Sequence, residues 1–336
     1  MATMKDVAKA AGVSLGSVSH YLSGRVTVSP VKASQIQRAI DELGYRVDQG
    51  ARSLRRKQTQ TIGLILPDIS NPFYGELARV IEHRLWDEGF QVFFCDSACD
   101  IVREQAQFLN LLDRRADGIF VIYGSERSVL PQLANETKTP VIFLDRPVQG
   151  RPSVASDNYL GGGMAAEHLL SLGHTHIGAL VGNAEIANIQ DRMAGFTAAL
   201  IQEGVTLDPK YVLYGAQDLA LGDRVVELMH LTSPPTAIFA TNDIVAIGAW
   251  QKLLEQGFHI PRDVSLLGFD NVELGRLLLP PLTTIAQNIS RLGACATELL
   301  LSHFGNPTAI GRGAVVAPQL LVRGSTTHKC GEGKRM

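Results

Sequence analysis

Nine side chains in the second part of the chain combine polar groups and aromatic rings in a way that suits ligand binding. Most of them follow directly after an apolar, strand-like run, and the two aromatic residues lie in the turn after the first such run. Ligands of open α/β sheets bind beyond the carboxyl ends of the strands, so these residues are candidates for one site. They are Asn71, Phe73, Tyr74, Asp145, Arg146, Arg192, Asn242, Asp270 and Gln287.

The chemistry of this set fits a neutral ligand with many hydroxyl groups, such as a sugar. Carboxylates accept hydrogen bonds, guanidinium groups donate them and amides do both, while aromatic faces cover apolar C–H groups. The two carboxylates and two arginines of the set balance in formal charge. Each residue alone has a plainer alternative, because Asp or Asn at a strand end often caps the next helix. We assign that plainer role to Asp243.

Apolar runs alternate with amphipathic stretches from Thr61 onward, and this alternation predicts the elements that position the nine residues. Continuous apolar runs are typical of strands covered on both faces in a parallel sheet. The expected strands are 62–66, 91–95, 118–123, 141–144, 177–181, 212–214, 237–240 and 265–269, and the helices are 75–88, 103–115, 160–172, 191–203 and 244–256. A pause near residues 156–163 splits the series, so we expect an α/β core of two doubly wound parallel-sheet lobes with a cleft between them.

The first 46 residues read instead as three short helices. A helix over 5–11 ends at Gly12, Ser14 caps a second helix over 15–22, and Ser29 and Pro30 begin a third that runs to Leu43. Val18 and Leu22 of the second helix face the first, which leaves Leu15, Gly16, Ser17, Ser19 and His20 toward solvent. This pattern predicts a helix-turn-helix, although a generic three-helix bundle has the same pattern.

Charge separates this head from the rest of the chain. Residues 1–60 hold ten basic and four acidic residues, a formal charge of +6, whereas the remainder carries −8. A basic head suits a polyanion such as double-stranded DNA. In the polar connector 47–60, Leu54 stands among Arg52, Arg55 and Arg56. An apolar wedge between arginines is typical of minor-groove intercalation; the alternative is that Leu54 packs on the body.

Other function classes fit the sequence less well. The run Gly161-Gly162-Gly163 lacks dinucleotide-binding spacing, and no nucleophile-elbow motif is present, so a sugar-processing enzyme is the weaker hypothesis. We interpret His168, His174 and His176 as surface or turn residues. No metal site and no cofactor are expected. The N-terminus has no apolar segment of a secretion signal, so we expect a cytoplasmic protein with no membrane association rather than an exported sugar-binding protein.

Several motifs together resemble the lactose-repressor (LacI/GalR) family over residues 3–327, and its ribose and purine branches in particular. They include Met4–Ser14, Val18-Ser19-His20, Ala39–Tyr45, Ala51-Arg52-Ser53-Leu54, Asp157-Asn158, Asn242-Asp243 and Gly268-Phe269-Asp270-Asn271. The resemblance implies a helix-turn-helix head over 1–46, a hinge helix and linker over 47–60, a periplasmic-binding-protein-like core over 61–327 and a disordered tail over 328–336.

The resemblance also implies a function: a transcriptional regulator, most simply a repressor, that binds operator DNA as a homodimer under allosteric control by a small-molecule effector. The implied DNA-binding residues are Ser14, Leu15, Gly16, Ser17, Ser19, His20, Arg25, Ala51, Arg52, Leu54 and Arg55. The nine strand-end residues match the family's ribose-type pocket, so a monosaccharide such as ribose is the expected effector, with a purine or another metabolite as the alternative. Two departures stand out: Gly16 has no side chain to bind a base, and Gly50 weakens the hinge helix.

Overall fold

The computed structural model describes residues 2–23, 28–45, 58–305 and 313–329. The chain divides into two compact units, Met1–Gln60 and Thr61–Met336, which we treat separately. Part of the predicted DNA-binding set lies outside the described residues, and those assignments stay predictions. The residues concerned are Arg25, Ala51, Arg52, Leu54 and Arg55.

The first unit is a cluster of three helices, α1 (Met4–Ala10), α2 (Leu15–Ser23) and α3 (Pro30–Leu43). Thr3 and Asp6 form a reciprocal capping box that begins α1. Gly12 makes the turn with φ +63°, a conformation that glycine adopts readily. Ser14 Oγ then accepts the N–H of Ser17 at 3.1 Å, which caps α2 as the sequence predicts.

The apolar core of this unit joins all three helices. It is built around Val7, Val18 and Ile36, which have no exposed surface. One detail predicted from the sequence is wrong. Ser29 precedes α3 but makes no side-chain capping bond, so Pro30 alone favours the helix start. Ala39 lies on the core face of α3, and Leu43, the last residue of the helix, is exposed.

The second unit contains two six-stranded sheets, which confirms the predicted α/β class. The sheet of lobe 1 has the order β11-β5-β4-β3-β1-β2, and that of lobe 2 the order β12-β10-β9-β8-β6-β7. The strands of lobe 1 are β1 (Thr61–Leu66), β2 (Gln91–Asp96), β3 (Gly118–Val121), β4 (Val141–Leu144), β5 (Ser153–Ser156) and β11 (Ala314–Val316); those of lobe 2 are β6 (Ile177–Val181), β7 (Val212–Tyr214), β8 (Ala237–Ala240), β9 (Ser265–Asp270), β10 (Thr283–Ala286) and β12 (Gln319–Leu321). Their pairing is parallel except between β10 and β12.

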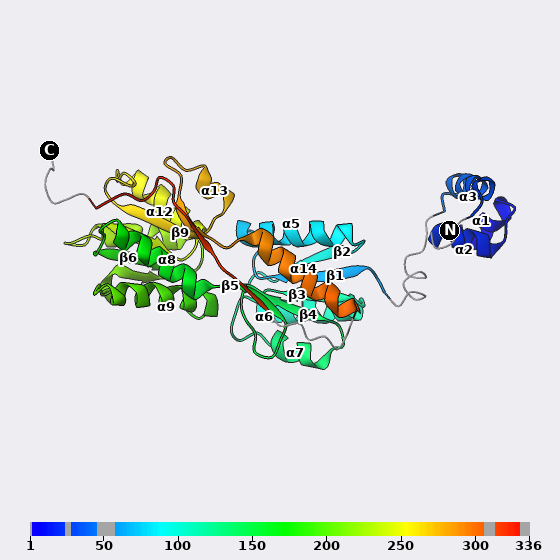
Figure 1. Cartoon of the computed structure of the whole chain (residues 1–336), viewed down its shortest axis with the longest axis horizontal. Helices are drawn as coiled ribbons and strands as arrows, with labels where there is room; N and C mark the ends of the chain where they lie inside the picture. Colours follow the sequence, from blue (N-terminus) through cyan, green and yellow to red (C-terminus); the bar gives the residue numbers. More distant parts are fainter. Residues whose placement is uncertain (1, 24–27, 46–57, 306–312, 330–336) are drawn as a thin grey trace. The chain divides into compact units, whose positions relative to one another are not determined.

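Helices cover both faces of each sheet (Figure 1). In lobe 1, α5 (Pro72–Asp87) and α14 (Ile289–Gly305) pack on one face, and α6 (Ile101–Asp113) and α7 (Leu130–Glu136) pack on the other. In lobe 2, α8 (Asn158–Ser171) and α9 (Ala187–Gln202) cover one face, and α10 (Leu219–Asp223), α11 (Val225–Met229) and α12 (Asp243–Glu255) cover the other. Short helices η1 (Pro209–Tyr211) and α13 (Glu273–Arg276) complete the fold.

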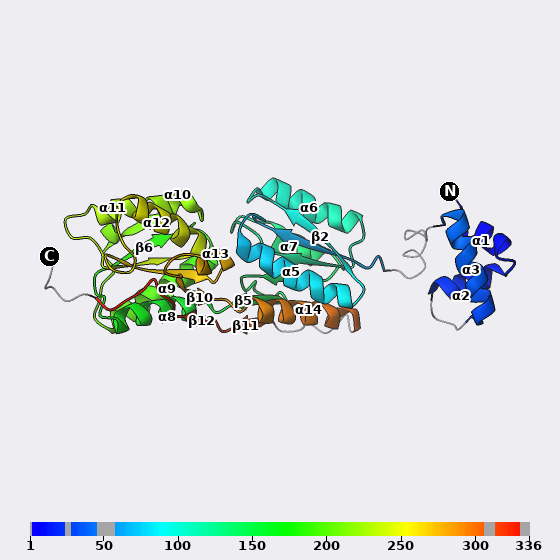
Figure 2. The ribbon, with the colours of Figure 1, turned by 90° about the horizontal axis from the view of Figure 1, so that it is seen from above.

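The chain crosses between the lobes three times: from β5 to α8, from β10 to α14, and from β11 to β12. Figure 2 shows β10, β5, β11 and β12 gathered where the lobes meet. The break in the strand–helix pattern predicted at 156–163 coincides with the first crossing. The elements predicted from the sequence do not include β5, β11, β12 or α14.

Strand β2 departs from the expectation that strands are covered on both faces. It is an edge strand, and the adjacent side chains of Phe93 and Phe94 are 52% and 45% exposed. Successive side chains of a strand point to opposite faces, so neither face of this edge is fully covered. No helix in the described part of the chain is long and apolar enough to cross a membrane.

Two of the three histidines interpreted as surface or turn residues, His168 and His174, instead hold the C-terminal segment at Thr326 and Thr327. His174 is buried, and its ring nitrogens lie 2.9 Å from Thr236 Oγ1 and from the carbonyl oxygen of Thr327. His168 Nε2 lies 2.9 Å from Thr326 Oγ1. The core was predicted to end at Thr327, with a disordered tail from residue 328. Lys329 nevertheless contacts the core, because its N–H donates to the Leu172 carbonyl.

Candidate effector cleft and DNA-reading helix

A cavity of about 710 Å³ opens between the carboxyl ends of strands from both lobes. Loops after β1, β2, β3 and β4 line it from lobe 1, and loops after β6 and β7 line it from lobe 2. Its volume lies in the range of small-molecule sites. Of the nine predicted residues, Asn71, Tyr74 and Arg146 line this cavity.

Asp145 links the two lobes beside the cavity. Its Oδ2 accepts a hydrogen bond of 2.7 Å from Nδ2 of Asn188, which is on α9 of lobe 2. The Tyr74 side chain of lobe 1 interacts with the same carboxylate; burial raises the pKa of Asp145, and this interaction lowers it by a smaller amount. The carboxylate is buried. The Asp145 side chain would therefore both hold the two lobes together and bind the ligand.

Arg192 is held on every side by groups of lobe 2. Its Nε donates to Asn158 Oδ1 at 2.9 Å, its Nη1 donates to the Thr241 carbonyl at 2.6 Å, and its Nη2 lies 3.3 Å from Asp270 Oδ1. The guanidinium carbon Cζ also lies over the Phe269 ring, 3.7 Å from the ring centroid. This rigid arrangement fixes both the cation and the acceptors around it.

Three further predicted residues belong to the same polar region. Gln287 Nε2 donates to Asp270 Oδ1 at 2.6 Å. This bond joins the segment after β10, where the chain crosses to lobe 1, to the last residue of β9. Asn242 caps α12 through Oδ1, and its Nδ2 points to Gln217 Oε1 at 3.5 Å. Asn71 likewise caps α5 by accepting the Phe73 N–H. Both asparagines therefore have the capping role that the sequence left open as an alternative.

The backbone at the two carboxylates is strained. Asp145 has φ +71° and Asp270 has φ +114°, values that side chains other than glycine rarely adopt. Such conformations cost about 1–3 kcal/mol each and concentrate at functional sites. Asp145 directly follows β4, and Asp270 is the last residue of β9. The strained backbone at each residue therefore sets the direction of a carboxylate at a strand end.

Within the described part of the chain, four buried polar atoms of the predicted site residues and of Asn188 have no hydrogen-bond partner. Three can accept a hydrogen bond: Asp145 Oδ1, Asn188 Oδ1 and Gln287 Oε1. One donates, namely Arg146 Nε. Buried polar groups are nearly always satisfied, so this surplus of acceptors indicates a partner that mainly donates.

Burial dominates the ionisation of the site. It raises the pKa of Asp145, against the lowering effect of Arg192 and Arg146. It raises the pKa of Asp270 to about 6, again opposed by Arg192. Burial, reinforced by the Asp145 and Asp270 carboxylates, keeps the pKa of the Tyr74 phenol well above its ordinary value, so the phenol remains a donor.

Phe73 does not line the cavity, contrary to the prediction. Its side chain is only 2% exposed and packs in the lobe 1 core with Leu77 and Ile81. Because Asn71 caps α5 and Pro72 begins it, position 73 falls on the inner face of the first turn. Of these two residues, only Tyr74 lines the cavity. Its ring contacts the Phe73 ring edge-on, with 5.3 Å between the ring centroids.

The sequence reading missed two polar residues of the site, Asn188 and Asn158. The predicted helix began at Asp191, whereas α9 begins at Ala187. A longer helix would have placed Asn188 one turn before Arg192 and on the same face. Asn158 follows the helix cap Asp157 at the first crossing between lobes.

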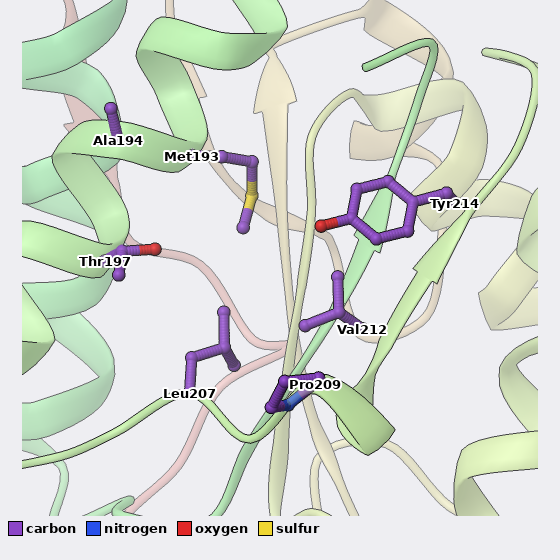
Figure 3. A pocket seen from close by; sticks show the side chains of 7 residues that line it. All are labelled: Met193, Ala194, Thr197, Leu207, Pro209, Val212 and Tyr214. Carbon is purple, nitrogen blue, oxygen red and sulfur yellow. The ribbon is translucent and has the colours of Figure 1, made fainter.

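Figure 3 shows a second cavity, lined by residues of α9, η1 and β7, that contains none of the predicted residues. Its volume is about 430 Å³, and most of its lining is apolar, including Met193, Leu207 and Val212. It lacks the buried, unpaired polar atoms of the interlobe cleft. In the described ranges no group of three or more His, Cys, Asp or Glu could hold a metal ion.

The predicted DNA-reading face is the outer face of α2. Leu15 is 44% exposed, Gly16 and His20 are exposed, and Ser17 and Ser19 are partly exposed. Val18 is fully buried in the opposite direction. A hydrogen bond of 2.8 Å from the Tyr21 hydroxyl to Gln37 Oε1 ties α2 to α3. The face is thus presented on a supported helix.

Comparison with known proteins agrees with both units. Residues 3–48 match the family model described as bacterial regulatory proteins, lacI family, and residues 166–326 match a periplasmic binding protein-like domain. The HTH-type transcriptional repressor PurR of Aliivibrio fischeri is 33% identical over 335 residues, covering 98% of this chain and 99% of the relative. The ribose operon repressor of Escherichia coli is 32% identical over 329 residues, covering 97% and 100%.

The fold comparison gives the same answer. The structure of the Lac repressor dimer bound to operator and the anti-inducer ONPF superposes with a TM-score of 0.86 at 26% identity, covering 97% of this chain and 99% of that one. Similarity at these levels extends over both units rather than over one of them. The chain belongs to the lacI family of bacterial regulatory proteins.

Proposed function

We propose that this chain is a sequence-specific repressor whose affinity for operator DNA is set by a neutral, hydroxyl-rich effector in the interlobe cleft. A monosaccharide such as ribose is the first candidate effector. The chain is a regulator in this proposal and not an enzyme: its curated relatives are named as repressors, and the polar groups of the cleft are arranged to bind rather than to react.

The observation that carries the effector class is the imbalance among the unpaired buried atoms. Three acceptors, on Asp145, Asn188 and Gln287, accompany a single donor on Arg146. Sugar hydroxyls both donate and accept, so they satisfy this pattern. An anionic ligand supplies acceptors only, and it would meet the Asp145 and Asp270 carboxylates.

A purine is the second candidate, because PurR is among the most similar relatives. Purine N–H groups donate to the same acceptors, and the Tyr74 ring offers a stacking surface at the cleft. Phe73 is withdrawn into the core, but Tyr74 and Tyr123 both line the cavity, so an aromatic face is available to either ligand. Ribose is favoured because its hydroxyl groups both donate and accept hydrogen bonds, which suits the unpaired acceptors and the unpaired donor of the site.

DNA recognition is assigned to the head. The outer face of α2 would enter the major groove, and exposed Lys5, Lys9, Lys32 and Arg38 would neutralise phosphates. Leu54 in the connector would serve as the minor-groove wedge, a role that stays a prediction. Because Gly16 lacks a side chain, base contacts at that position would come from its neighbours Leu15 and His20.

A homodimer would place two heads on one pseudo-palindromic operator. The exposed β2 edge with Phe93 and Phe94 is the first candidate contact. The second lies in lobe 2, where Leu277 and Leu279 are 71% and 86% exposed. Contacts on both lobes would let closure of the cleft change the spacing of the two heads. A coupling of about 1–3 kcal/mol is enough for regulation.

The test uses the full-length protein and two assays. Calorimetric titration with ribose, other pentoses, hexoses, polyols and hypoxanthine identifies the effector class. Fluorescence anisotropy then compares an inverted-repeat duplex, selected from a random pool, with a scrambled duplex, over a series of salt concentrations. We expect tight, salt-sensitive and sugar-sensitive binding to the inverted repeat alone. Equal affinity for both duplexes, with and without sugars, would refute the proposal.

A further inference from the structure

A carboxylate from lobe 1 reaches the start of α9 in lobe 2. Glu126 lies in the loop after β3, and its Oε1 accepts the backbone N–H of Ala187 at 3.1 Å. Ala187 is the first residue of α9, and the residue before it, Ile186, provides no side-chain cap. Lobe 1 therefore supplies the cap that lobe 2 lacks.

The same oxygen of Glu126 also accepts a hydrogen bond from Nη1 of Arg146. Arg146 Nη2 donates to the Tyr123 carbonyl, and the guanidinium lies over the Tyr123 ring, 4.3 Å from its centroid. These contacts hold Arg146 on three sides and leave Nε as its unpaired donor. Glu126 thus orients Arg146, a cavity-lining residue whose Nε has no partner among the described residues.

We propose that Glu126 is a positioning residue that latches the two lobes closed and sets effector affinity through that closure. It joins Arg146 of lobe 1 to α9, the helix that carries Asn188 and Arg192. A charged acceptor at a helix N-terminus gains from the helix dipole and from the charge-assisted bond. When the lobes separate, the carboxylate loses the Ala187 N–H while it keeps Arg146, so the latch acts on closure alone.

The neighbouring residue gives a matched control. Arg127 forms an ion pair with Glu185 across the same rim at 3.9 Å, but both side chains are largely exposed, 79% and 69%. Exposed pairs of this kind contribute little. If mere charge across the rim closed the lobes, Arg127→Gln and Glu126→Gln would have similar effects. If the latch closes them, only the Glu126 changes matter.

Hydrogen exchange of the full chain reads the latch directly and requires no effector. In Glu126→Ala, we expect the amides of the first turn of α9 to exchange roughly 10-fold faster, because a bond to a charged group is lost. Glu126→Gln should show a smaller increase, and Arg127→Gln should match the wild type. Unchanged exchange in Glu126→Ala, or an equal increase in Arg127→Gln, overturns the proposal.

The effect on affinity rests on the proposed function and is tested separately with ribose as the probe. We expect Glu126→Ala to weaken ribose binding roughly 10-fold. Glu136→Ala should leave ribose binding unchanged, because Glu136 is an exposed carboxylate at the end of α7 that does not line the cavity. Equal ribose affinity in wild type and Glu126→Ala overturns the link between latch and effector. If the wild type does not bind ribose but the exchange result holds, the latch is supported and the assignment of the sugar fails.

Discussion

At the residue scale, Asp243 does not have the helix-cap role predicted from the sequence, because Asn242 caps α12. The Asp243 carboxylate instead accepts the Thr284 hydroxyl at 2.7 Å and the Val272 N–H at 2.8 Å. Both partners lie outside its own helix, so Asp243 ties strand β10 and the loop after β9 to α12. Burial, with the nearby Asp270 carboxylate, raises its pKa to about 8.

This raised pKa makes stability depend on pH. Between the unfolded pKa near 3.8 and about 8, the folded chain holds a proton on Asp243 that the unfolded chain does not. Stability from this group is therefore full at low pH and declines as pH rises through that range. We expect the melting temperature of the wild type to fall relative to that of Asp243→Asn between pH 5 and pH 9, measured by thermal-shift assay. Parallel curves would contradict the assignment.

Arg192 is the second residue with a sharp prediction. Lysine keeps the positive charge but cannot serve Asn158, Thr241 and Asp270 at once, nor place a guanidinium over Phe269. We expect Arg192→Lys to fold, to bind operator normally, and to lose ribose affinity by about 10-fold or more. Calorimetry and DNA anisotropy measure the two properties. Wild-type ribose affinity in this variant would remove Arg192 from the site.

At the scale of elements, α8 and α9 touch through their backbones. A Cβ on Gly162 would lie 1.9 Å from the Arg192 carbonyl oxygen, and one on Gly195 would lie 1.9 Å from the Tyr159 carbonyl oxygen. The run Gly161-Gly162-Gly163 fits no phosphate-binding motif, and its Gly162 instead allows this close contact between the two helices. It joins the helix that carries Arg192 to the helix that begins at the first crossing between lobes, so the two should move as one body.

The glycine run contains its own control. Gly162→Ala forces the helices apart and should lower the free energy of unfolding by about 3 kcal/mol. The neighbouring Gly163 meets nothing closer than 3.9 Å. Gly163→Ala should therefore be neutral or stabilising by up to about 1 kcal/mol, from helix propensity alone. Denaturant unfolding measures both, and equal effects would show that the close contact is unimportant.

The elements that the sequence reading missed divide into two kinds. The helix α14 has the local pattern of a helix, with Leu292, Ala296 and Leu300 four residues apart and buried together, so it could have been predicted. Strands β11 and β12 have three residues each and form only because β5 and β10 lie beside them. Such short strands depend on tertiary pairing, which no local pattern records. The strands with continuous apolar runs were found with nearly correct bounds.

The candidate site was predictable in composition but not in arrangement. Strand-end position and chemistry identified most of its charged and amide groups. Which of them line open space, and which bond to each other beneath it, depends on the relative placement of the two lobes. The start of α5 within lobe 1 decides that Phe73 is buried in the core, whereas the adjacent Tyr74 faces the cavity.

At the scale of the whole molecule, the uncovered edge of lobe 1 predicts how copies meet. An exposed edge strand with large apolar side chains invites pairing. We expect Phe93→Asp to weaken the dimer at least about 10-fold, measured by sedimentation velocity over a range of concentrations. Val315→Asp is the control, because Val315 is 64% exposed on β11, at the opposite edge of the same sheet. Dissociation by both changes, or by neither, would exclude the β2 edge as the contact.

The three crossings between lobes have a consequence for inheritance. Each lobe is assembled from separated stretches of the gene: lobe 1 takes β1–β5, α14 and β11, and lobe 2 takes α8–β10 and β12. No single recombination event can transplant one lobe from a homologue without splitting the other. An exchange of one contiguous gene segment would therefore replace part of both lobes, whereas the helical head is encoded by one uninterrupted stretch and can be exchanged as a block.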